Sequence, residues 1–461
     1  MIMISVRDFY ESLISLNGVN SIKEIEDIVN DRNKNIKVNI TKISLEKCNG
    51  WVLDDSGVIH NESNSFFQIK GIEYSLNNKP IVKQPIIIQN EIGYLGIIVK
   101  KINGILHFLM QAKIEPGNIN KVQISPTIQA TKSNFEQKHG GKKPAYLEYF
   151  LNSNKYNIVV DQIQSEQSSR FLGKRNRNII IDIGDEDIEV LSSHFWLTLG
   201  QIKKNMEVDN LVNMDTRTVL SCIPFWKFDS TMLNKENINI NKYFYNSIFN
   251  EDEITYVEVF KKINDFKMFN DVQRNLISLN KLDNWRYQNN EFVCKNPYNF
   301  KVIFCDLNIE GREVKQRCQP LFEATGKALF VLLCSKFGSK YKYLVKLTSE
   351  IGTFDTVELG PSIQCEGSEI NTFLSSRLGK FYLDNMKAKE KIKNDVILSE
   401  EGGRFYHEEN RNVIIEVNHK ELEFLDEHEY MWLDFKTLNF LVQFNNVLNI
   451  QLRNLLSIIG R

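Results

Sequence analysis

The sequence predicts an α+β fold made of two copies of one module. Identical residues recur along the chain at a nearly constant offset of 234 to 236 positions. In both copies, segments with strand periodicity come first and segments with helical periodicity come last. A chain of 461 residues is also too long for one ordinary core, so two or more domains are expected.

Specific residues define the repeat. Gln84-Pro85 recurs as Gln319-Pro320 and Arg170-Phe171 as Arg404-Phe405. Further matches join Glu115 to Glu350, Gln129 to Gln364, Arg177 to Arg411, Trp196 to Trp432, Asn210 to Asn446 and Arg217 to Arg453. Two such modules are expected to pack face to face about a pseudo-two-fold axis.

Composition and charge restrict the classes of function. Hydrophobic residues make up 42% and charged residues 25% of the chain, which is typical of globular proteins. The net charge of -1 gives no broad electrostatic basis for binding nucleic acid or an anionic membrane. Asp8 and Glu11 stand too early for a secretory signal, and no apolar run approaches the about 20 residues of a membrane span. The seven scattered cysteines form no C-x-x-C pair, which favours free thiols in a reduced cytoplasm.

Residues 1–47 are expected to form two short helices and a first strand. Ser5 with Asp8 and Ser21 with Glu24 match the capping-box pattern at helix starts. From residue 36 onward, apolar and polar residues alternate as in a half-buried strand. The first repeat is expected to follow over residues 48–225.

A β-hairpin is the clearest local prediction within the first repeat. Residues 94–102 and 105–114 are apolar, β-rich runs separated by Asn103-Gly104, which favours a type I′ turn. Residues 122–128 indicate a further strand, which Pro126 restricts to an edge or a bulge. Residues 177–183 indicate another strand.

Helical periodicity is expected from residue 193 to the end of the first repeat. Phe195, Leu199, Ile202 and Met206 would form one stripe, and Asp215 would cap a second helix. Residues 226–281 are expected to be connecting helices, and residues 282–461 to form the second repeat.

The sequence lacks the common signatures of metal and phosphate sites. No two of the seven histidines stand four positions apart with an acidic partner, and no cysteine joins them, so no metal site is predicted. Neither a G-x-x-x-x-G-K loop nor a G-x-G-x-x-G turn between a strand and a helix is present.

Residues 115–150 are the first candidate for a ligand site. They follow neither clean periodicity and are rich in short polar side chains: Asn118, Gln123, Ser125, Thr127, Gln129, Thr131, Ser133 and Asn134. Such groups suit a polyhydroxylated ligand held by many modest hydrogen bonds. Tyr146, Tyr149 and Phe150 offer a stacking face for a base or a sugar. The alternative is an ordered surface loop between two strands.

Three basic features are candidates for binding a diphosphate. Residues 139–144 are glycine-rich and basic. A denser group precedes a strand and consists of Arg170, Lys174, Arg175 and Arg177. Arg217 and Arg453 stand at matched positions. The respective alternatives are a mobile solvent loop, a solvated strand edge and an ion pair with a group such as Asp215.

Glu115, His139 and Tyr146 are the candidates for a general acid or base. Glu115 precedes Pro116-Gly117, so it is expected at a strand end beside a turn, where site residues often lie. Its match, Glu350, leaves two interpretations open: a structural role in both copies or a functional role in one.

Long stretches of the sequence resemble NDP-hexose 2,3-dehydratases. They are QAKIEPGNINKVQISPTIQATKSNF, YLEYF, KRNRNIIID and FWLTLGQIKKNMEVDNLVNMDTRTVLSCIPF, and Trp51, His60 and Phe66-Phe67 resemble the entry motif of that family. The resemblance covers essentially the whole chain and implies a tandem pair of Nudix-like α/β/α modules in a homodimer. The hydrolytic Nudix motif, a glycine followed by a glutamate-rich helix, is absent from both copies.

The resemblance implies removal of the C2 hydroxyl of dTDP-4-keto-6-deoxy-D-glucose as water. The product would be the 3,4-diketo-2,6-dideoxy sugar of deoxysugar biosynthesis, which a ketoreductase or a PLP aminotransferase would consume. No cofactor is implied. Two other classes remain open: a nucleotide-sugar-binding protein without turnover, and a degenerate Nudix-type hydrolase.

The expected substrate-binding residues lie mostly in the first copy. They are His60, Asn118, Gln123, Ser125, Thr127, Gln129, Thr131, Asn134, Tyr149, Arg170, Lys174, Arg175, Arg177, Asn178, Asn210 and Arg217. Because the second copy loses several of these polar residues, the first copy is expected to supply the working site. Changes at Gln123, Asn134 or Arg170 are then expected to abolish turnover, and changes at Glu358 or Arg404 to affect mainly stability. Lys174, Arg175 and Arg177 are expected on the diphosphate, with Tyr146 or Tyr149 against the base.

Overall fold

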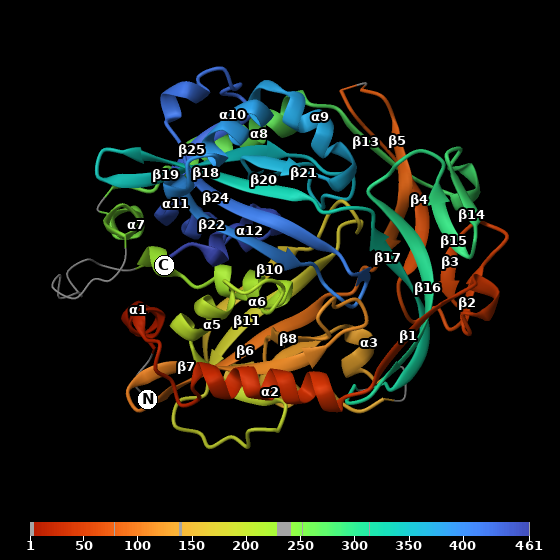
Figure 1. The fold of residues 1–461 in the computed structure, drawn as a ribbon, viewed down its shortest axis with the longest axis horizontal. Helices are drawn as coiled ribbons and strands as arrows, with labels where there is room; N and C mark the ends of the chain where they lie inside the picture. Colours follow the sequence, from red (N-terminus) through yellow and green to blue (C-terminus); the bar gives the residue numbers. More distant parts are fainter. Residues whose placement is uncertain are drawn as a thin grey trace.

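The computed structural model describes residues 4–77, 79–137, 141–227, 241–250, 252–312 and 314–460. Two series of elements follow one another in the same order (Figure 1). The first begins with helices α1 (Val6–Ile14) and α2 (Ile22–Asn35) and strand β1 (Val38–Ile43). The second begins with helices α7 (Lys242–Ile248) and α8 (Tyr256–Phe269) and strand β13 (Val272–Ile277). The predicted α+β fold with two repeated halves is confirmed; below, the first half means residues 4–227 and the second half residues 241–460.

Local side chains explain where the first two helices begin. The backbone N–H of Ser5 donates to Asp8 Oδ2 at 2.7 Å, and that of Ser21 donates to Glu24 Oε2 at 2.6 Å. Both predicted capping boxes are therefore confirmed. Helix α2 buries Ile25 on the face that packs against the core.

A large mixed sheet forms the centre of the first half, in the order β10-β11-β6-β7-β12, with β8 paired to β7 and β9 to β6. Its strands are β6 (Gly93–Ile102), β7 (Ile105–Ile114), β8 (Val122–Ser125), β9 (Ile128–Ala130), β10 (Asn157–Ser165), β11 (Arg175–Asp182) and β12 (His194–Thr198). Strands β6 and β7 form the predicted hairpin, and Asn103 and Gly104 have φ of 52° and 83°, as a type I′ turn requires. Strand β11 runs parallel to β6.

The second half contains a matching large sheet, in the order β20-β19-β18-β24-β22, with β21 paired to β18 and β25 to β19. Its strands are β18 (Leu329–Phe337), β19 (Lys340–Thr348), β20 (Glu358–Pro361), β21 (Ile363–Cys365), β22 (Ile392–Ser399), β24 (Glu409–Glu416) and β25 (Tyr430–Asp434). Each strand takes the place of its first-half counterpart, so the repeat extends to strand pairing.

Helices cover both faces of each large sheet. On one face of the first sheet, Leu147 and Phe150 of α4 (Leu147–Leu151) pack against Ile98 and Leu109, near the short helix α3 (Lys132–Phe135). The other face packs against α5 (Leu199–Asn205) and α6 (Met214–Ser221). The second sheet lies between α9 (Ile370–Ser375) with α10 (Arg377–Met386) and α11 (Phe435–Leu441) with α12 (Ile450–Ile458). Each half is thus an α/β/α layered structure.

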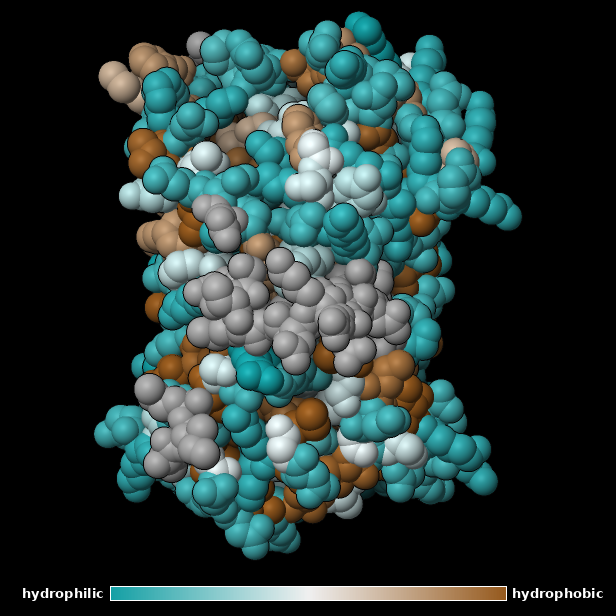
Figure 2. All heavy atoms as spheres, turned by 90° about the vertical axis from the view of Figure 1, so that its left-hand side faces the viewer, coloured by the Kyte–Doolittle hydropathy of each residue, from teal (hydrophilic) through white to brown (hydrophobic). Residues whose placement is uncertain are grey.

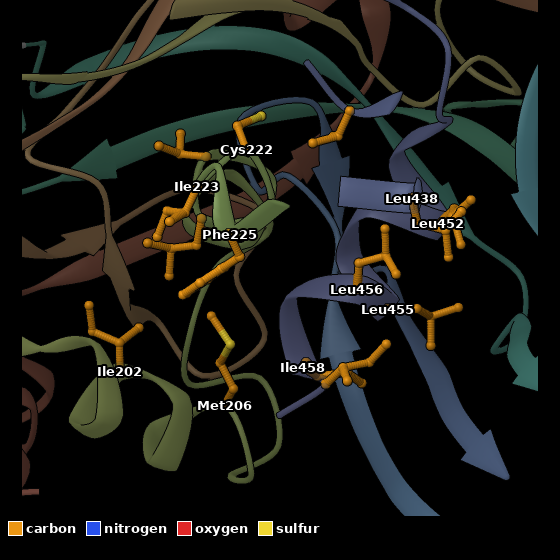
Figure 3. Close-up of a cluster of buried hydrophobic side chains, with 14 of the residues drawn as sticks. Ile202, Met206, Cys222, Ile223, Phe225, Leu438, Leu452, Leu455, Leu456 and Ile458 are labelled. Carbon is orange, nitrogen blue, oxygen red and sulfur yellow. The ribbon is translucent and has the colours of Figure 1, made fainter. Parts of the chain in front are cut away.

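The two halves share one hydrophobic core. Helices α6 and α12 contact each other between the large sheets (Figure 1). Figure 3 shows side chains of this core from both halves, among them Ile202 and Cys222 from the first and Leu452 and Leu455 from the second. Because each half buries apolar surface against the other, the halves stabilise each other.

Two fully buried arginines connect the halves across this core. Arg217 of α6 donates to the carbonyls of Val212 and Ser399 at 2.6 and 2.7 Å. Arg453 of α12 donates to the carbonyl of Ser165, which is the match of Ser399. The contacts therefore follow the internal repeat, and the guanidinium of Arg217 donates to backbone carbonyls.

Two smaller sheets exchange one strand between the halves. The first half contributes β2 (Trp51–Leu53), β3 (Ile59–Asn61), β4 (Gln68–Leu76) and β5 (Val82–Ile88) to one sheet, and strand β13 of the second half pairs antiparallel with β4. The other sheet contains β14 (Trp285–Gln288), β15 (Glu291–Cys294), β16 (Phe300–Ile309), β17 (Gln316–Ala324) and β23 (Phe405–Tyr406), and β1 pairs antiparallel with β16. Residues 226–281 thus contain strand β13 besides the expected helices. The boundaries predicted for the two repeats at residues 48–225 and 282–461 remain a prediction.

The strand predicted over residues 122–128 is interrupted at Pro126, as expected, and forms β8 and β9, which pair with different neighbours. Two other local predictions were wrong in detail. Phe195 lies in strand β12, and α5 begins only at Leu199 because Thr198 caps it. Helix α6 is capped by Asn213, whose Oδ1 accepts from the N–H of Thr216, so Asp215 lies inside the first turn.

Three further features of the structure are its cysteines, the length of its helices and its surface. The seven cysteines are free. None of the helices in the described part of the chain is long and apolar enough to cross a membrane. Figure 2 shows mostly hydrophilic residues on the face that lies to the left in Figure 1, with hydrophobic residues between them.

Candidate active site

A cavity of about 610 Å³ lies where the two halves meet. Its walls come from the first large sheet, from both small sheets and from the loop between β22 and β23. Among the charged, amide and aromatic side chains that line it are Lys47, Trp51, Phe67, Lys113, Glu115, Gln129, Glu166, Lys174, Asp215, Arg312, Glu401 and Arg404. Most belong to the first half, but Arg312, Glu401 and Arg404 come from the second.

A chain of amides holds Glu115 at the end of β7. Gln129 donates from Nε2 to Glu115 Oε1 at 3.0 Å, and Asn213 donates from Nδ2 to Gln129 Oε1 at 3.2 Å. Lys113 Nζ donates to the carbonyl of Gln129 at 3.0 Å. The carboxylate is therefore fixed by β9 and by the start of α6.

The turn that follows Glu115 is bound to the second half by its backbone. The N–H of Gly117 donates to the carbonyl of Gly402 at 2.7 Å, and the N–H of His407 donates to the carbonyl of Gly117 at 2.8 Å. A Cβ on Gly117 would lie 1.5 Å from the carbonyl oxygen of Phe405, so only glycine fits there. We call this arrangement the clamp.

The clamp brings Glu401 of the second half close to Glu115. A Cβ built on Gly403 would lie 2.1 Å from Glu401 Oε1 and 3.4 Å from Glu115 Oε1. The separation of the two carboxylate oxygens therefore cannot exceed the sum of these two distances. A pair of carboxyl groups contributed by different halves thus faces the cavity.

Three further carboxyl groups, of Glu166, Asp215 and Asp306, line the cavity. Glu166 accepts a hydrogen bond from Asn176 Nδ2 at 2.7 Å. Asp215 is only 1% exposed, and neither of its carboxylate oxygens has a hydrogen-bond partner among the described residues. A buried polar group without a partner in a cavity wall is available to a ligand.

Burial and mutual repulsion raise the pKa values of these carboxyls. Burial raises the pKa of Glu401 to about 7, with Glu115 adding to the rise and Arg404 opposing it. Burial also raises the pKa of Asp215 well above its usual value, and the neighbouring Glu166 contributes to the rise. The cluster therefore holds protons near neutral pH and offers both an acid and a base.

Lys174 and Arg404 are two of the cationic groups that line the cavity. Burial lowers the pKa of the Lys174 ammonium to about 8, although Glu166 favours its charged form. The guanidinium of Arg404 lies over the Phe67 ring, 4.4 Å from Cζ to the centroid, and donates to the carbonyl of Gly403 at 2.9 Å. Arg404 Nε has no hydrogen-bond partner in the described part of the chain. These groups offer charged donors to an anionic ligand.

Trp51 and Phe67 form an apolar part of the wall. Their ring centroids are 4.8 Å apart, and Trp51 Nε1 donates to the carbonyl of Cys318 at 2.9 Å. Apolar ring surfaces of this kind suit a planar base or a sugar ring.

The model of the NDP-hexose 2,3-dehydratase family matches residues 22–223 and 256–459. This chain belongs to that family. The two matched segments correspond to the two halves, and the family resemblance of the sequence is confirmed.

Three curated relatives of this 2,3-dehydratase family member share the name dTDP-4-dehydro-6-deoxy-alpha-D-glucopyranose 2,3-dehydratase. The relative from Saccharopolyspora spinosa is 34% identical over 98% of this chain and 94% of its own length. The relatives from Streptomyces violaceoruber and Amycolatopsis orientalis are 33% and 32% identical, over 91% and 89% of this chain and 92% and 84% of their own. A solved structure titled "Crystal structure of ADP compounds hydrolase" aligns at 16% identity over 30% of this chain and 73% of its own, with a TM-score of 0.19, which is too low to support an argument.

The cavity of this dehydratase-family chain contains part of the predicted site. Glu115, Gln129, Thr131, Asn134 and Lys174 line it. Three other residues predicted for the site, Tyr146, Tyr149 and His139, are not among the described residues that line the cavity. Tyr146 Oη donates to the carbonyl of Glu189 at 2.8 Å, Tyr149 stacks on Tyr156 with centroids 5.6 Å apart, and His139 lies outside the described residues.

Several other predicted polar residues make contacts within the fold. His60 Nε2 lies 3.5 Å from Asp54 Oδ2, and Asn118 Nδ2 donates to the carbonyl of Lys121 at 2.8 Å. Gln123 Nε2 donates to Ser399 Oγ at 2.8 Å. Ser125 and Thr127 are fully buried, and Thr127 Oγ1 accepts from the N–H of Ile98 at 2.9 Å.

The predicted basic group is dispersed, and only Lys174 faces the cavity. The Arg175 guanidinium lies 3.8 Å above the Phe354 ring, and Arg177 forms a 2.6 Å ion pair with Asp161. The two predicted asparagines are engaged as well. Asn178 Nδ2 donates to the carbonyl of Asn176 at 3.1 Å, and Asn210 Nδ2 donates to Glu409 Oε2 at 2.8 Å.

Arg170 and Arg404, which match in the repeat, lie in opposite places from those expected. Arg404 lines the cavity, whereas Arg170 is buried, with Nη2 at 2.9 Å from Glu366 Oε2 and 3.7 Å from Glu408 Oε1. We call the place around Arg170 the sister site. The reason for the exchange of places is that each arginine lies in a loop that packs against the other half. The loop of Arg404 binds the turn at Gly117 of the first half, and the loop of Arg170 binds the turn at Gly352 of the second half.

The frame of the sister site repeats that of the cavity. Gln364 Nε2 donates to Glu350 Oε1 at 2.9 Å, as Gln129 does to Glu115. The N–H of Gly352 donates to the carbonyl of Ser168 at 2.8 Å, as in the clamp.

Sequence reasoning missed Asp215, Glu166, Glu401 and Arg404 as members of the site. No motif marks them, but the repeat offered a signal, because position 401 is Glu where its match, Gln167, is an amide. No cluster of three or more His, Cys, Asp or Glu side chains in the described ranges is arranged to hold a metal ion.

Proposed function

We propose that this protein is a nucleotide-sugar 2,3-dehydratase, a hydro-lyase that removes the C2 hydroxyl of dTDP-4-keto-6-deoxy-D-glucose as water. The product is the 3,4-diketo-2,6-dideoxy sugar. The observation that supports the reaction is the cavity in which the unpartnered Asp215 lies with Glu401 and Lys174. The shared name of three relatives over nearly their whole length supports the substrate.

The chemistry requires one base and one acid. The C4 ketone acidifies the C3 proton, so a side-chain base removes it, and the C2 hydroxyl then leaves with a proton from a general acid. Charged donors near the C4 oxygen stabilise the enolate that forms, and the ammonium groups of Lys113 and Lys174 are such donors. The sequence of bonds made and broken includes no redox step, so the proposal requires no redox cofactor.

The cavity also suits the rest of the substrate. Its volume of about 610 Å³ lies within the roughly 300–1,000 Å³ of ligand pockets. We assign the diphosphate to Arg404 and Arg312, because both line the cavity, whereas Arg175 and Arg177 are engaged elsewhere. Trp51 and Phe67 then contact the base or the sugar.

The finer expectations from the family resemblance belong to the same proposal. Each half is a Nudix-like module, for which the α/β/α layering is the supporting feature. The protein acts as a homodimer in the cytoplasm, and a ketoreductase or a PLP aminotransferase consumes its product.

The test is an assay with purified protein and dTDP-4-keto-6-deoxy-D-glucose, with and without magnesium, in which a ketoreductase and NADPH trap the diketone. Equal formation of reduced dideoxy sugar with and without magnesium is the expected result. Cleavage to dTMP and sugar phosphate that depends on magnesium would instead indicate a hydrolase. Tight dTDP binding without any conversion would indicate a binding protein.

A further inference from the structure

The cavity and the sister site can be compared position by position, because the repeat relates them. Three positions of the frame keep their residue type: Glu115 matches Glu350, Gln129 matches Gln364 and Arg404 matches Arg170. The hydrogen bond between amide and carboxylate is kept as well, at 3.0 Å in the cavity and 2.9 Å in the sister site. This comparison places Glu115 in a frame that both sites share.

Other positions differ in their chemistry between the two sites. Glu401 matches Gln167, Asp215 matches Gln451 and Lys174 matches Glu408. A side-chain amide neither gives nor takes a proton near neutral pH, so the sister site cannot use these first two positions for acid–base work. Among the positions compared, Glu401 and Asp215 are therefore the two at which the cavity has a carboxyl and the sister site an amide.

Glu401 is positioned by the clamp. The clamp fixes the backbone of Gly402 on the turn after Glu115, and the carboxylates of Glu401 and Glu115 both lie beside Gly403. The carboxylate of Glu115 already accepts a hydrogen bond from Gln129. The carboxylate of Glu401 accepts none from the described residues that line the cavity. Glu401 is thus the member of the pair with the freer oxygen atoms.

Asp215 provides the second, independent observation. Its backbone is fixed in the first turn of α6, which Asn213 caps. Its side chain lines the cavity, is 1% exposed and leaves both oxygens without a hydrogen-bond partner in the described part of the chain. A polar group buried in this way is satisfied by a ligand hydroxyl.

We propose that Glu401 is the base and Asp215 the acid of the dehydration, an inference that rests on the proposed function. Glu401 takes the C3 proton, and the C–H electron pair forms the enolate of the C4 ketone. That pair then forms the C2=C3 double bond as the C2–O bond breaks, and the departing hydroxyl takes the proton of Asp215 and leaves as water. The resulting enol gains a proton at C2 and loses that of its C3 hydroxyl, which gives the 3,4-diketone, and solvent restores the proton of Asp215.

The electrostatics of the cavity agree with these roles. Burial raises the pKa of Asp215, so this side chain stays protonated at pH values at which an ordinary aspartate is ionised, as a general acid requires. Glu401 has a pKa of about 7 because Arg404 partly offsets its burial, so it is ionised just above neutral pH. Glu115, which helps to raise the pKa of Glu401, then acts as a positioning residue beside it.

The test uses hydrogen exchange to separate the two roles. With dTDP-4-keto-6-deoxy-D-glucose in deuterated water, Glu401→Gln should lower kcat by about 10²–10⁴-fold and abolish exchange of the C3 proton. Asp215→Asn should lower kcat by a similar factor but keep C3 exchange, because the base remains. Both variants should bind dTDP within about threefold of the wild type, since neither group contacts the nucleotide.

Glu400→Gln is the matched control, because Glu400 is the buried neighbour in the same loop, accepts from Asn410 Nδ2 and does not line the cavity. It should keep kcat. If Glu401→Gln fails to fold, Glu401→Asp keeps a carboxyl farther from the substrate and should show slow but measurable C3 exchange. Wild-type rates of C3 exchange in either Glu401 variant, or loss of exchange in Asp215→Asn, would overturn the assignment. A wild-type protein that forms no diketone would overturn the proposed function itself.

Discussion

The matched arginines give the sharpest test of which site works. We predict that Arg170→Met destabilises the fold but keeps turnover, whereas Arg404→Met keeps stability but weakens dTDP binding. Methionine preserves most of the aliphatic volume, so the comparison isolates the charge. Arg170 is buried, bonded to Glu366 and close to Glu408, and its guanidinium lies 4.5 Å above the Phe300 ring.

The magnitude follows from what each arginine leaves behind. Loss of Arg170 leaves Glu408, with 3% of its side chain exposed, without its cation, and breaking a buried pair in this way costs about 3–5 kcal/mol of unfolding free energy. Burial lowers the pKa of Arg404, so its charge is already disfavoured and its removal should change stability by less than about 1 kcal/mol. A lost charged hydrogen bond to the diphosphate should weaken dTDP binding by about 1.5–3 kcal/mol.

Urea unfolding and calorimetric titration with dTDP measure these two effects. The loss of unfolding free energy in Arg170→Met, relative to the wild type, should become smaller as the pH falls from 8 to 5. The pKa of Glu408 is raised in the folded protein, so its charged form opposes folding at high pH and protonation removes that penalty. An Arg170→Met protein that unfolds like the wild type but has no turnover would refute the assignment of the cavity as the working site.

The remaining predictions concern the clamp and the reaction. Gly117→Ala should lower the melting temperature and abolish turnover, because its Cβ would meet the Phe405 carbonyl at 1.5 Å and overpacking costs about 1–3 kcal/mol or more; an unchanged melting curve would contradict the clamp. The pH profile of kcat/KM should rise through about 7 as Glu401 ionises and fall above about 8 as Lys174 loses its proton, and a flat profile would exclude both roles. Product trapped by a ketoreductase in deuterated water should contain one deuterium at C2, seen by mass spectrometry and NMR, and its absence would contradict the enol.

Local features of the fold could be predicted from the sequence because they depend on neighbouring residues. The Asn103-Gly104 turn needs two residues that tolerate positive φ, and the caps need Ser5 and Ser21. The repeat then predicted two similar halves. The pairing of β1 with β16 and of β13 with β4 could not be predicted in this way, because strand periodicity shows which face is buried but not which partner lies alongside.

The same limit applies to the site. Glu115 could be predicted because it stands at a strand end beside Pro116-Gly117, and Gln129 because it lies in the same polar stretch of sequence. Glu401 and Arg404 lie far along the chain, and they enter the cavity only because their loop packs on the turn at Gly117. Arg170 and Arg404 were therefore expected in each other's places: the sequence match relates the arginines, but the crossing of the loops decides which site each one enters.

The crossing of the loops has a consequence for how such a chain can change over generations. In a dimer of two identical chains with this arrangement, one substitution alters both sites at once. In the fused chain, position 401 belongs to one site and its match, position 167, to the other. A carboxyl can therefore be gained in one site while an amide is kept in the other. One site can also become purely structural, as the sister site has with its Arg170–Glu366 ion pair, while the other site keeps its catalytic groups.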